Sequence, residues 1–191
     1  MIEKLIKNTR SYRRFFQNKK VTIKILKELI NLARYSASAA NRQPLKYIIS
    51  NQEETNNNIF PTLSWAGYIK DWSGPKEGEK PSSYIIMLAD TDISENYWCD
   101  PGIAAQNILL GATEKELGGC ILGAIDKDTL RKNLNIEERY KILYVIALGK
   151  PKEKVEIEET NSEGNIKYWR DDHGVHHVPK RKLEDIIIKQ N

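Results

Sequence analysis

Two nearly continuous apolar runs are the strongest constraint on how this 191-residue chain can fold. Residues 84–89 and 142–148 contain almost no polar side chain, and residues 47–50 and 120–124 are shorter runs of similar character. Short apolar runs of this kind, bounded by turn residues, are typical of β-strands. Because a strand without polar alternation is buried on both faces, the sequence predicts a sheet that is covered by helices.

Two helices are predicted in the first part of the chain. Residues 1–7 repeat apolar side chains at helical spacing, which predicts a helix that ends at a cluster of basic residues. Residues 23–33 repeat them in the same way, and Thr22 precedes this run. Threonine is favoured at the N-cap, where its hydroxyl accepts a backbone N–H, so a second helix is expected to begin there.

The middle of the chain carries a third helical pattern and two turn-rich stretches. Asp100 and Pro101 have the chemistry of an N-cap followed by a first helical residue, and an Ala- and Leu-rich pattern continues to Leu117. This helix is expected to be buried. Residues 71–81 contain glycines, prolines and charges, which predicts an exposed loop that serves as a lid or a substrate-side insertion, and residues 56–58 are expected to form a polar turn.

Residues 9–15 are basic and follow the first predicted helix. Arg10, Arg13 and Arg14 stand beside the hydroxyl of Ser11 within about one helical turn. A guanidinium group is planar, permanently charged and donates hydrogen bonds in pairs, which suits a phosphate. The alternative is a solvated charge cluster that the helix dipole favours at a helix C-terminus.

Residues 36–44 combine small side chains with two carboxamides. Ser36 and Ser38 would let a flat ring approach the backbone, while Asn41 and Gln43 can each donate and accept hydrogen bonds. The uracil-like edge of a flavin requires both, so this segment and the basic segment together suggest FMN. The alternative is an ordinary helix-ending turn, since Ser, Asn and Pro are common turn residues.

Composition predicts a single domain, residues 1–191, and argues against several other classes of protein. Thirty basic and 26 acidic residues are interspersed, without the basic arm that a nucleic-acid partner would favour. Cys99 and Cys120 form no disulfide framework, and Cys120 has no partner motif, which predicts a buried thiol. No apolar run approaches the roughly 18 residues of a membrane helix and no signal core is present, so a cytoplasmic location without a membrane partner is expected.

Three histidines near the C-terminal end raise the question of a metal site. His173, His176 and His177 stand next to Asp171 and Asp172, but no second cluster of ligands accompanies them. Zinc sites usually show tighter ligand patterns, so no metal site is predicted.

Several motifs, taken in order, resemble those of the FMN-dependent nitroreductase family. They are Arg-Ser at 10–11, Ser-Ala-Ala-Asn-Arg-Gln-Pro at 38–44, Asp-Pro-Gly-Ile-Ala-Ala-Gln-Asn at 100–107, Gly-Gly-Cys-Ile-Leu-Gly-Ala at 118–124 and Val-Pro-Lys-Arg-Lys-Leu at 178–183. The resemblance covers nearly the whole chain. It implies an α+β fold with a central, mainly antiparallel sheet flanked by helices, assembled as an obligate homodimer with two FMN sites at the subunit interface.

The resemblance also implies which residues hold the cofactor. Those that would contact the phosphate, ribityl or ring oxygens come from both ends of the chain: Arg10, Ser11, Arg13, Lys180 and Arg181. Thr9 stands where many relatives have a second Arg, so the choice among Arg10, Arg13 and Arg14 for the phosphate stays open.

The flavin ring is assigned by resemblance to two further segments. Ser36, Ser38, Asn41 and Gln43 match the segment that reaches the flavin of the opposite subunit. The other segment lies along the ring near N5 and comprises Ile121, Leu122 and Gly123, with the glycine allowing a close backbone approach. Trp65 and Tyr68 belong to an aromatic-rich part of the sequence that is expected to contribute to the core or the dimer interface, and one of the two is the candidate to cover the open face of the flavin.

The expected activity is that of an FMN-dependent NAD(P)H oxidoreductase with a ping-pong cycle. NADH or NADPH would give a hydride to flavin N5, and a nitroaromatic, quinone or similar acceptor would then take the same place. No side chain is expected to act as a catalytic acid or base, because positioning and the electrostatic setting of the flavin carry the reaction. The alternatives are a flavin carrier or redox sensor without nicotinamide turnover, and a basic interaction protein.

Overall fold

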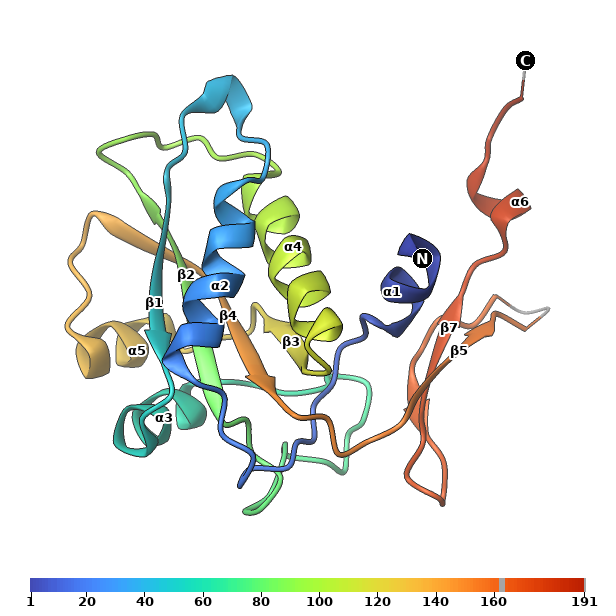
Figure 1. Cartoon of the computed structure of the whole chain (residues 1–191). Coiled ribbons are helices and arrows are strands. Elements are labelled where there is room, and N and C mark those ends of the chain that lie inside the picture. The colour runs from blue at the N-terminus through green and yellow to red at the C-terminus, as the bar shows by residue number, and fades with distance from the viewer. Residues whose placement is uncertain (162–163, 191) are drawn as a thin grey trace.

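A four-stranded antiparallel sheet forms the centre of the computed structural model, which describes residues 1–161 and 164–190 (Figure 1). Its strands are β1 (Leu45–Ser50), β2 (Ser83–Asp90), β3 (Gly118–Leu122) and β4 (Tyr140–Gly149). They lie in the order β1-β2-β4-β3, and every neighbouring pair is antiparallel. The four predicted strands are therefore present, and the α+β class with a central antiparallel sheet is confirmed.

Burial on both faces explains the continuous apolar pattern of the central strands. All eight residues of β2 are buried, and they alternate between two separate parts of the core. Ile85 and Met87 pack on one side of the sheet, whereas Ile86 and Leu88 pack on the other. An antiparallel sheet with helices on both faces thus needs the same apolar pattern that is usual in buried parallel sheets.

Helices cover both faces of this sheet (Figure 1). The first face is covered by α2 (Ile23–Arg34) and α4 (Asp100–Glu114), through residues that include Leu26, Leu29 and Ile108. The second is covered by α3 (Glu53–Ile59) and α5 (Lys127–Leu134), through Ile59 and Leu130. The short helix α1 (Ile2–Asn8) lies at the C-terminal end of α4, where Thr9 Oγ1 donates to Thr113 Oγ1 at 3.0 Å.

One of the two predicted N-caps is confirmed, and the other is wrong. Thr22 caps α2 as expected, since its Oγ1 accepts the backbone N–H of Ile25 at 3.3 Å. In α4, however, Cys99 is the N-cap and Asp100 already lies in the helix. The carboxylate of Asp100 is turned instead toward the segment before β1, where it accepts hydrogen bonds from Ser38 and Ala39. The helix ends at Glu114, before the predicted Leu117, and is buried as expected.

Two other sequence-based expectations need correction. Residues 56–58 belong to α3 rather than to a turn, because buried Asn56 is held by tertiary hydrogen bonds. Its side chain accepts from Ser50 Oγ at 2.7 Å and donates to the carbonyl of Ser82 at 3.0 Å. Strand β3 begins and ends two residues before the predicted range, 120–124. The residues after Leu122 leave this sheet, and the carbonyl of Ala124 accepts the backbone N–H of Ser64 at 3.0 Å, beside an isolated bridge between Leu63 and Ile125.

A second, smaller sheet that the sequence did not reveal lies beside the main body (Figure 1). It consists of β5 (Val155–Glu159), β6 (Trp169–Arg170) and β7 (His176–Lys180), in the order β5-β7-β6. Strand β7 is parallel to β5 and antiparallel to β6. The chain then forms one turn of helix, α6 (Leu183–Ile186). No helix in the described residues has the length and apolarity that a membrane crossing requires.

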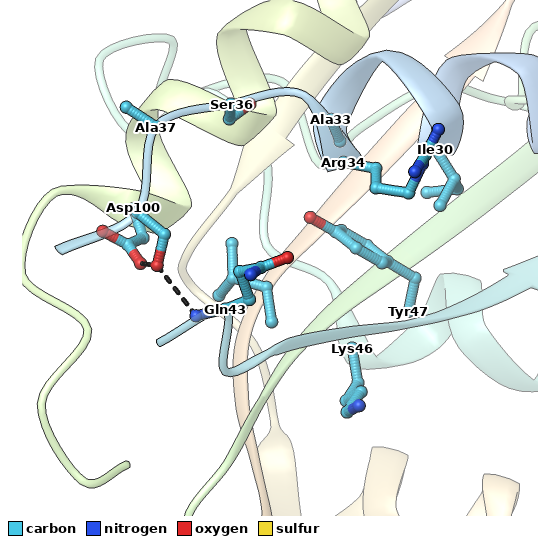
Figure 2. Close-up of a pocket in the computed structure, with 11 residues that line it drawn as sticks. Ile30, Ala33, Arg34, Ser36, Ala37, Gln43, Lys46, Tyr47 and Asp100 are labelled. Carbon is cyan, nitrogen blue, oxygen red and sulfur yellow. Dashed lines mark hydrogen bonds between the residues drawn. The ribbon is translucent and has the colours of Figure 1, made fainter. Parts of the chain in front are cut away.

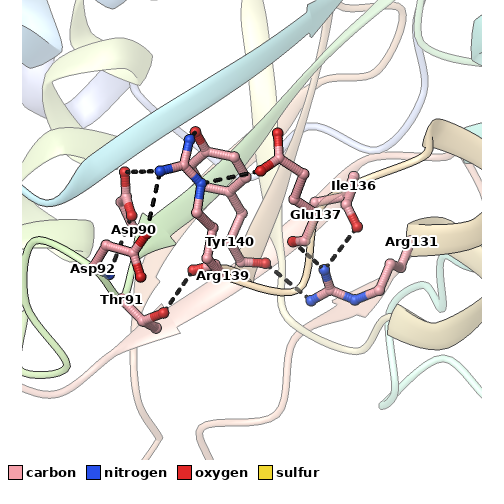
Figure 3. A network of polar contacts seen from close by, with 8 residues as sticks. All are labelled: Asp90, Thr91, Asp92, Arg131, Ile136, Glu137, Arg139 and Tyr140. Carbon is pink, nitrogen blue, oxygen red and sulfur yellow. Dashed lines mark hydrogen bonds and ion pairs between the residues drawn. The ribbon is translucent and has the colours of Figure 1, made fainter.

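A network of polar contacts fixes the connections at one end of the sheet (Figure 3). Arg131 of α5 donates to the carbonyls of Ile136, Glu137 and Tyr140 at 2.6 to 3.0 Å, which holds the loop that leads into β4. Arg139 forms an ion pair with Asp92 at 3.3 Å, and its carbonyl accepts the backbone N–H of Thr91 at 3.0 Å. The start of β4 and the segment after β2 are therefore tied together.

Candidate functional site

The basic segment after α1 lies against the first residues of β3. Ser11 forms an isolated parallel bridge with Gly119, and the backbone N–H of Tyr12 donates to the carbonyl of Gly119 at 3.0 Å. Strand β3 is an edge strand, so the basic segment occupies only the beginning of its free edge. Ile121, Leu122 and Gly123 follow further along the same strand and its continuation.

A buried carboxylate that the sequence analysis did not single out holds this segment in place. Oε1 of Glu153 accepts the backbone N–H groups of both Arg13 and Arg14, and its Oε2 pairs with Arg170 at 2.9 Å. The side chain of Glu153 is completely buried. It therefore fixes the backbone of the arginines from a position about 140 residues further along the chain.

The structure separates the three arginines by their partners. Arg14 donates two hydrogen bonds to Glu79, from Nε at 2.9 Å and from Nη2 at 2.6 Å. Lys152 Nζ also lies 3.2 Å from this carboxylate. The hydrogen bond from Arg14 is the main cause that lowers the pKa of Glu79 to about 2, since burial acts in the opposite direction. Arg14 is therefore engaged in a structural ion pair.

Arg10 and Arg13 keep buried donor atoms without partners. The Nε of each is buried and has no hydrogen-bond partner among residues 1–161 and 164–190. Their terminal nitrogens are held by backbone carbonyls, Arg10 by Ile6 at 2.8 Å and Arg13 by Ser11 at 3.2 Å. A buried, charged donor without a partner is costly, so this pair is suited to an anionic ligand such as a phosphate.

His176 supports Arg13 from the second sheet. Its ring nitrogen Nε2 lies 3.0 Å from Nη1 of Arg13, and the guanidinium also lies 4.8 Å from the centre of the Tyr168 ring. Burial is the main cause that lowers the pKa of His176 to about 4, and the charges of Arg13 and Arg170 act in the same direction. A neutral imidazole can accept the N–H of Arg13, which orients the guanidinium.

The Ser36–Gln43 region is a tightly bent loop anchored on the first turn of α4. Ser38 Oγ donates to Asp100 Oδ2 at 2.6 Å and accepts the backbone N–H of Gln43 at 2.9 Å. Ala40, Asn41 and Gln43 have φ angles between 51° and 53°, a left-handed conformation that is uncommon outside glycine. Such backbone persists only where surrounding contacts enforce it, and it is frequent at ligand sites.

Under this loop lies a cavity of about 320 Å³ (Figure 2). Ser36, Ser38 and Gln43 line it together with Tyr47 of β1 and Asp100. Burial raises the pKa of Tyr47 to about 12, so its phenol keeps its proton near neutral pH. Ser36 Oγ additionally accepts from Asn107 Nδ2 at 2.8 Å. These side chains thus form one polar group at the amino end of α4.

Within one chain, the loop and the basic segment are kept apart by α4. Asp100 contacts the loop at one end of this helix, and Thr113 contacts Thr9 near the other. Thirteen residues of α-helix correspond to about 20 Å. The structure therefore does not bring Ser38, Asn41 and Gln43 to the arginines of the same chain, and Ser36 contacts Asn107 midway along α4 instead.

The residues at the end of β3 and just after it lie partly at the surface. Ile121 and Gly123 are exposed, whereas Leu122 points into the core. A Cβ placed on Gly123 would lie 3.8 Å from the ring of Tyr144, an ordinary contact, so the protein itself leaves room for a side chain there. The neighbouring Cys120 is buried, and burial raises the pKa of its thiol, as expected for a core residue.

The remaining candidates lie in the second sheet and the loop that faces it. Lys180 ends β7 and Arg181 follows it; both are exposed, while His176 at the other end of this strand contacts Arg13. Tyr68 is exposed, and its ring lies 4.9 Å from that of Tyr168. Trp65 is largely buried in the core under the sheet. A role for either aromatic residue in covering a flavin stays a prediction.

Comparison with known proteins agrees with this architecture. The sequence profile of the Nitroreductase family matches residues 6–74 and 79–150, which is most of the chain. The match spans the basic segment, the Ser36–Gln43 loop, α4 and the whole central sheet. The chain therefore belongs to the nitroreductase family.

Sequence relatives and solved structures are similar to this protein over most of its length. A protein of Archaeoglobus fulgidus named "Putative NADH dehydrogenase/NAD(P)H nitroreductase" is 24% identical over 165 residues, which cover 82% of this chain and 90% of the relative. A nitroreductase family protein from Streptococcus pneumoniae TIGR4 superposes with a TM-score of 0.74 at 18% identity, with full coverage of both chains. An FMN-dependent nitroreductase from Clostridium difficile R20291 gives 0.64 at 21% identity, covering 85% of this chain and 93% of that one.

Proposed function

We propose that this protein is an FMN-dependent oxidoreductase that moves a hydride from NADH or NADPH to a nitroaromatic, quinone or similar acceptor by a ping-pong cycle. One observation carries the proposal: two unpartnered, buried arginine nitrogens lie beside the start of β3, and the exposed Gly123 peptide lies beyond its end. Gly119 and Gly123 are four residues apart, about 13 Å along an extended chain. A ligand with a phosphate at one end and a flat ring at the other matches this arrangement.

The residues near the start of β3 would bind the FMN phosphate or hold its binding groups in place. Arg10 and Arg13 would neutralise the phosphate, and Ser11 would add a hydroxyl donor. His176, which is neutral, and Glu153, which is buried, would hold Arg13 in place by the contacts described above. Lys180 and Arg181 would complete the phosphate site from the end of β7. FMN, when bound, supplies the hydride-carrying chemistry itself, so the protein contributes binding, orientation and electrostatics.

The Gly123 segment would set the position of the reacting ring. Its exposed peptide groups can lie along a flat molecule because glycine lacks a Cβ. Among residues 1–161 and 164–190, strand β3 pairs with β4 alone beyond the Ser11 bridge, which leaves its outer edge for a ligand. Holding two flat reactants in contact accounts for much of the catalysis in a reaction without a side-chain acid or base.

A homodimer is part of this proposal. The resemblance to the nitroreductase family implies that the Ser36–Gln43 loop, which is anchored at the amino end of α4, contacts the flavin ring held by a second copy of the chain. The chain end leaves the body of the molecule (Figure 1). Its large apolar side chains Leu183, Ile186 and Ile188 are exposed. Contiguous exposed apolar residues mark interaction surfaces, here proposed to cover a second copy of this chain.

The visible absorption spectrum of the purified protein tests the function. The protein is loaded with FMN, and NADH and then NADPH are added without oxygen. Bleaching of the flavin band, followed by recovery when a nitroaromatic or quinone is added, supports both half-reactions. A flavin band that persists would instead favour the flavin carrier or redox sensor. Failure to retain FMN at all would contradict the proposal.

A further inference from the structure

A second cavity, of about 480 Å³, lies where Gly123 meets the amino end of α4. Its walls come from the segment that leads into α4, from the first turn of α5 and from the start of β4. Gly123 thus belongs both to the segment proposed to contact the flavin and to the wall of this cavity. Pockets that hold small organic ligands have volumes in this range.

Aromatic side chains form much of the cavity wall. They are Tyr97, Trp98 and Tyr144, and a Cβ added to Gly123 would lie 3.8 Å from the Tyr144 ring. Trp98 has a φ of 33°, which is unusual for a bulky residue. The guanidinium of Arg42 lies 5.6 Å from the Trp98 ring. Flat apolar walls of this kind suit an aromatic ligand.

The charged side chains that line the cavity are positive. Among the described residues that line it, the charged side chains are Lys127 and Lys141, and the first turn of α4 adds the positive end of a helix dipole. Lys141 Nζ lies 5.6 Å from the Tyr97 ring, and neither lysine forms an ion pair within residues 1–161 and 164–190. The cavity therefore combines aromatic walls with two available ammonium groups.

Three acidic side chains in or near the segments that form the cavity walls have other partners, whereas Asp128, beside Lys127, is exposed. Asp100 accepts from Ser38 and Ala39, and Asp126 caps α5 by accepting the backbone N–H of Thr129 at 3.1 Å. Asp92 pairs with Arg139 in the network that ties the start of β4 to the segment after β2 (Figure 3). The same network therefore holds the start of β4, the strand that carries Lys141.

We propose that this cavity holds the electron acceptor and selects aromatic acceptors that carry a carboxylate, which Lys127 and Lys141 recognise. The proposal rests on the oxidoreductase function proposed above and specifies its substrate class. The acceptor ring would lie between the aromatic walls beside Gly123, and its carboxylate would point toward the two lysines. A neutral acceptor of the same shape would lack this second contact.

Kinetics with two matched acceptors test the proposal. 4-Nitrobenzoate and neutral 4-nitrobenzamide are compared with the FMN-loaded full-length protein. The ratio of their kcat/KM values is expected to favour the carboxylate about tenfold, through KM, and to fall toward one in Lys127→Met/Lys141→Met. Lys132→Met removes an exposed lysine of α5 that does not line the cavity, and it should keep the wild-type ratio.

A binding measurement separates this proposal from the function on which it rests. Quenching of Trp98 fluorescence by 4-nitrobenzoate requires no turnover, and Trp98→Phe reports the background from the other tryptophans. Quenching that the double lysine variant weakens, in a protein without turnover, would support the site while contradicting the function. Equal kcat/KM for the two acceptors, or an unchanged ratio in the double variant, would overturn the proposal. The proposal would also be overturned if the lysine variants raised the KM for NADH or NADPH and left the KM for the acceptor unchanged.

Discussion

Arg14 and Glu79 form a two-point ion pair, with Nε and Nη2 of Arg14 at 2.9 and 2.6 Å from the two carboxylate oxygens. The Glu79 side chain is 4% exposed, so the pair is shielded from water on the side of the acid. In the part of the chain that the structure describes, the buried Nε atoms of Arg10 and Arg13 have no hydrogen-bond partner. Three arginines that are equivalent in the sequence are therefore different in the structure, which leads to the first two predictions.

Glu79→Gln should lower the free energy of unfolding near pH 7 by about 2 kcal/mol, because the variant leaves Arg14 without its main charged partner. The pKa of Glu79 is lowered from 4.5 to about 2. The unfolded state therefore binds more protons in this range, and the contribution of Glu79 is lost as the pH falls from about 5 to about 2. Denaturant unfolding at several pH values measures this effect. A difference between wild type and variant that stays constant down to pH 2 would contradict it.

Arg10→Ala and Arg13→Ala should each weaken FMN binding about 10- to 100-fold, since a hydrogen bond to a charged group contributes about 1.5–3 kcal/mol. Arg14→Ala is the matched control. It should chiefly reduce stability, and its FMN affinity should stay within about threefold of wild type under conditions where it is folded. Titration of the three variants followed by flavin fluorescence gives the affinities. If Arg14→Ala loses affinity as strongly as the other two, the division among the arginines is wrong.

Much of the fold could be predicted because its long elements have strong apolar patterns. The four strands of the central sheet, α1, α2 and α4 were all expected at close to their observed positions. Helices α3 and α5 were missed because each buries few apolar side chains, chiefly Ile59 and Leu130. The strands of the second sheet are short and rich in charge, and α6 spans only four residues, so local pattern does not distinguish them from loop.

The partners of the candidate site could not be predicted for a different reason. Glu79, Glu153 and His176 contact the arginines across 65 to 163 residues of sequence, and no local motif encodes such distances. A signal did exist for His176, because it stands two residues before the Val178-Pro179-Lys180 motif that suggested phosphate binding. The antiparallel order of the sheet likewise came from family resemblance, since apolar runs alone indicate burial and not strand direction.

Gly123→Ala should lower FMN affinity while leaving the stability of the fold nearly unchanged. The added Cβ would lie 3.8 Å from Tyr144, so the free energy of unfolding should change by less than about 1 kcal/mol. FMN affinity should fall about tenfold, because the methyl group would occupy the space proposed for the ring. Gly119→Ala is the opposite case, since its Cβ would lie 2.8 Å from the carbonyl of Ala147 and should destabilise the protein by about 1–3 kcal/mol. Unchanged FMN binding in Gly123→Ala would contradict the proposed position of the ring.

Replacement of Leu183, Ile186 and Ile188 by serine tests whether the chain end holds two copies together. These side chains are 66%, 58% and 101% exposed, which leaves them without contacts that could stabilise a single chain. The wild-type protein should sediment as a dimer, and the triple variant should dissociate at micromolar concentration while unfolding at a similar temperature. FMN affinity should fall with dissociation, because the partner's Ser36–Gln43 loop is proposed to contact the flavin ring. A wild-type monomer that binds FMN with full affinity would show that one chain completes the site alone.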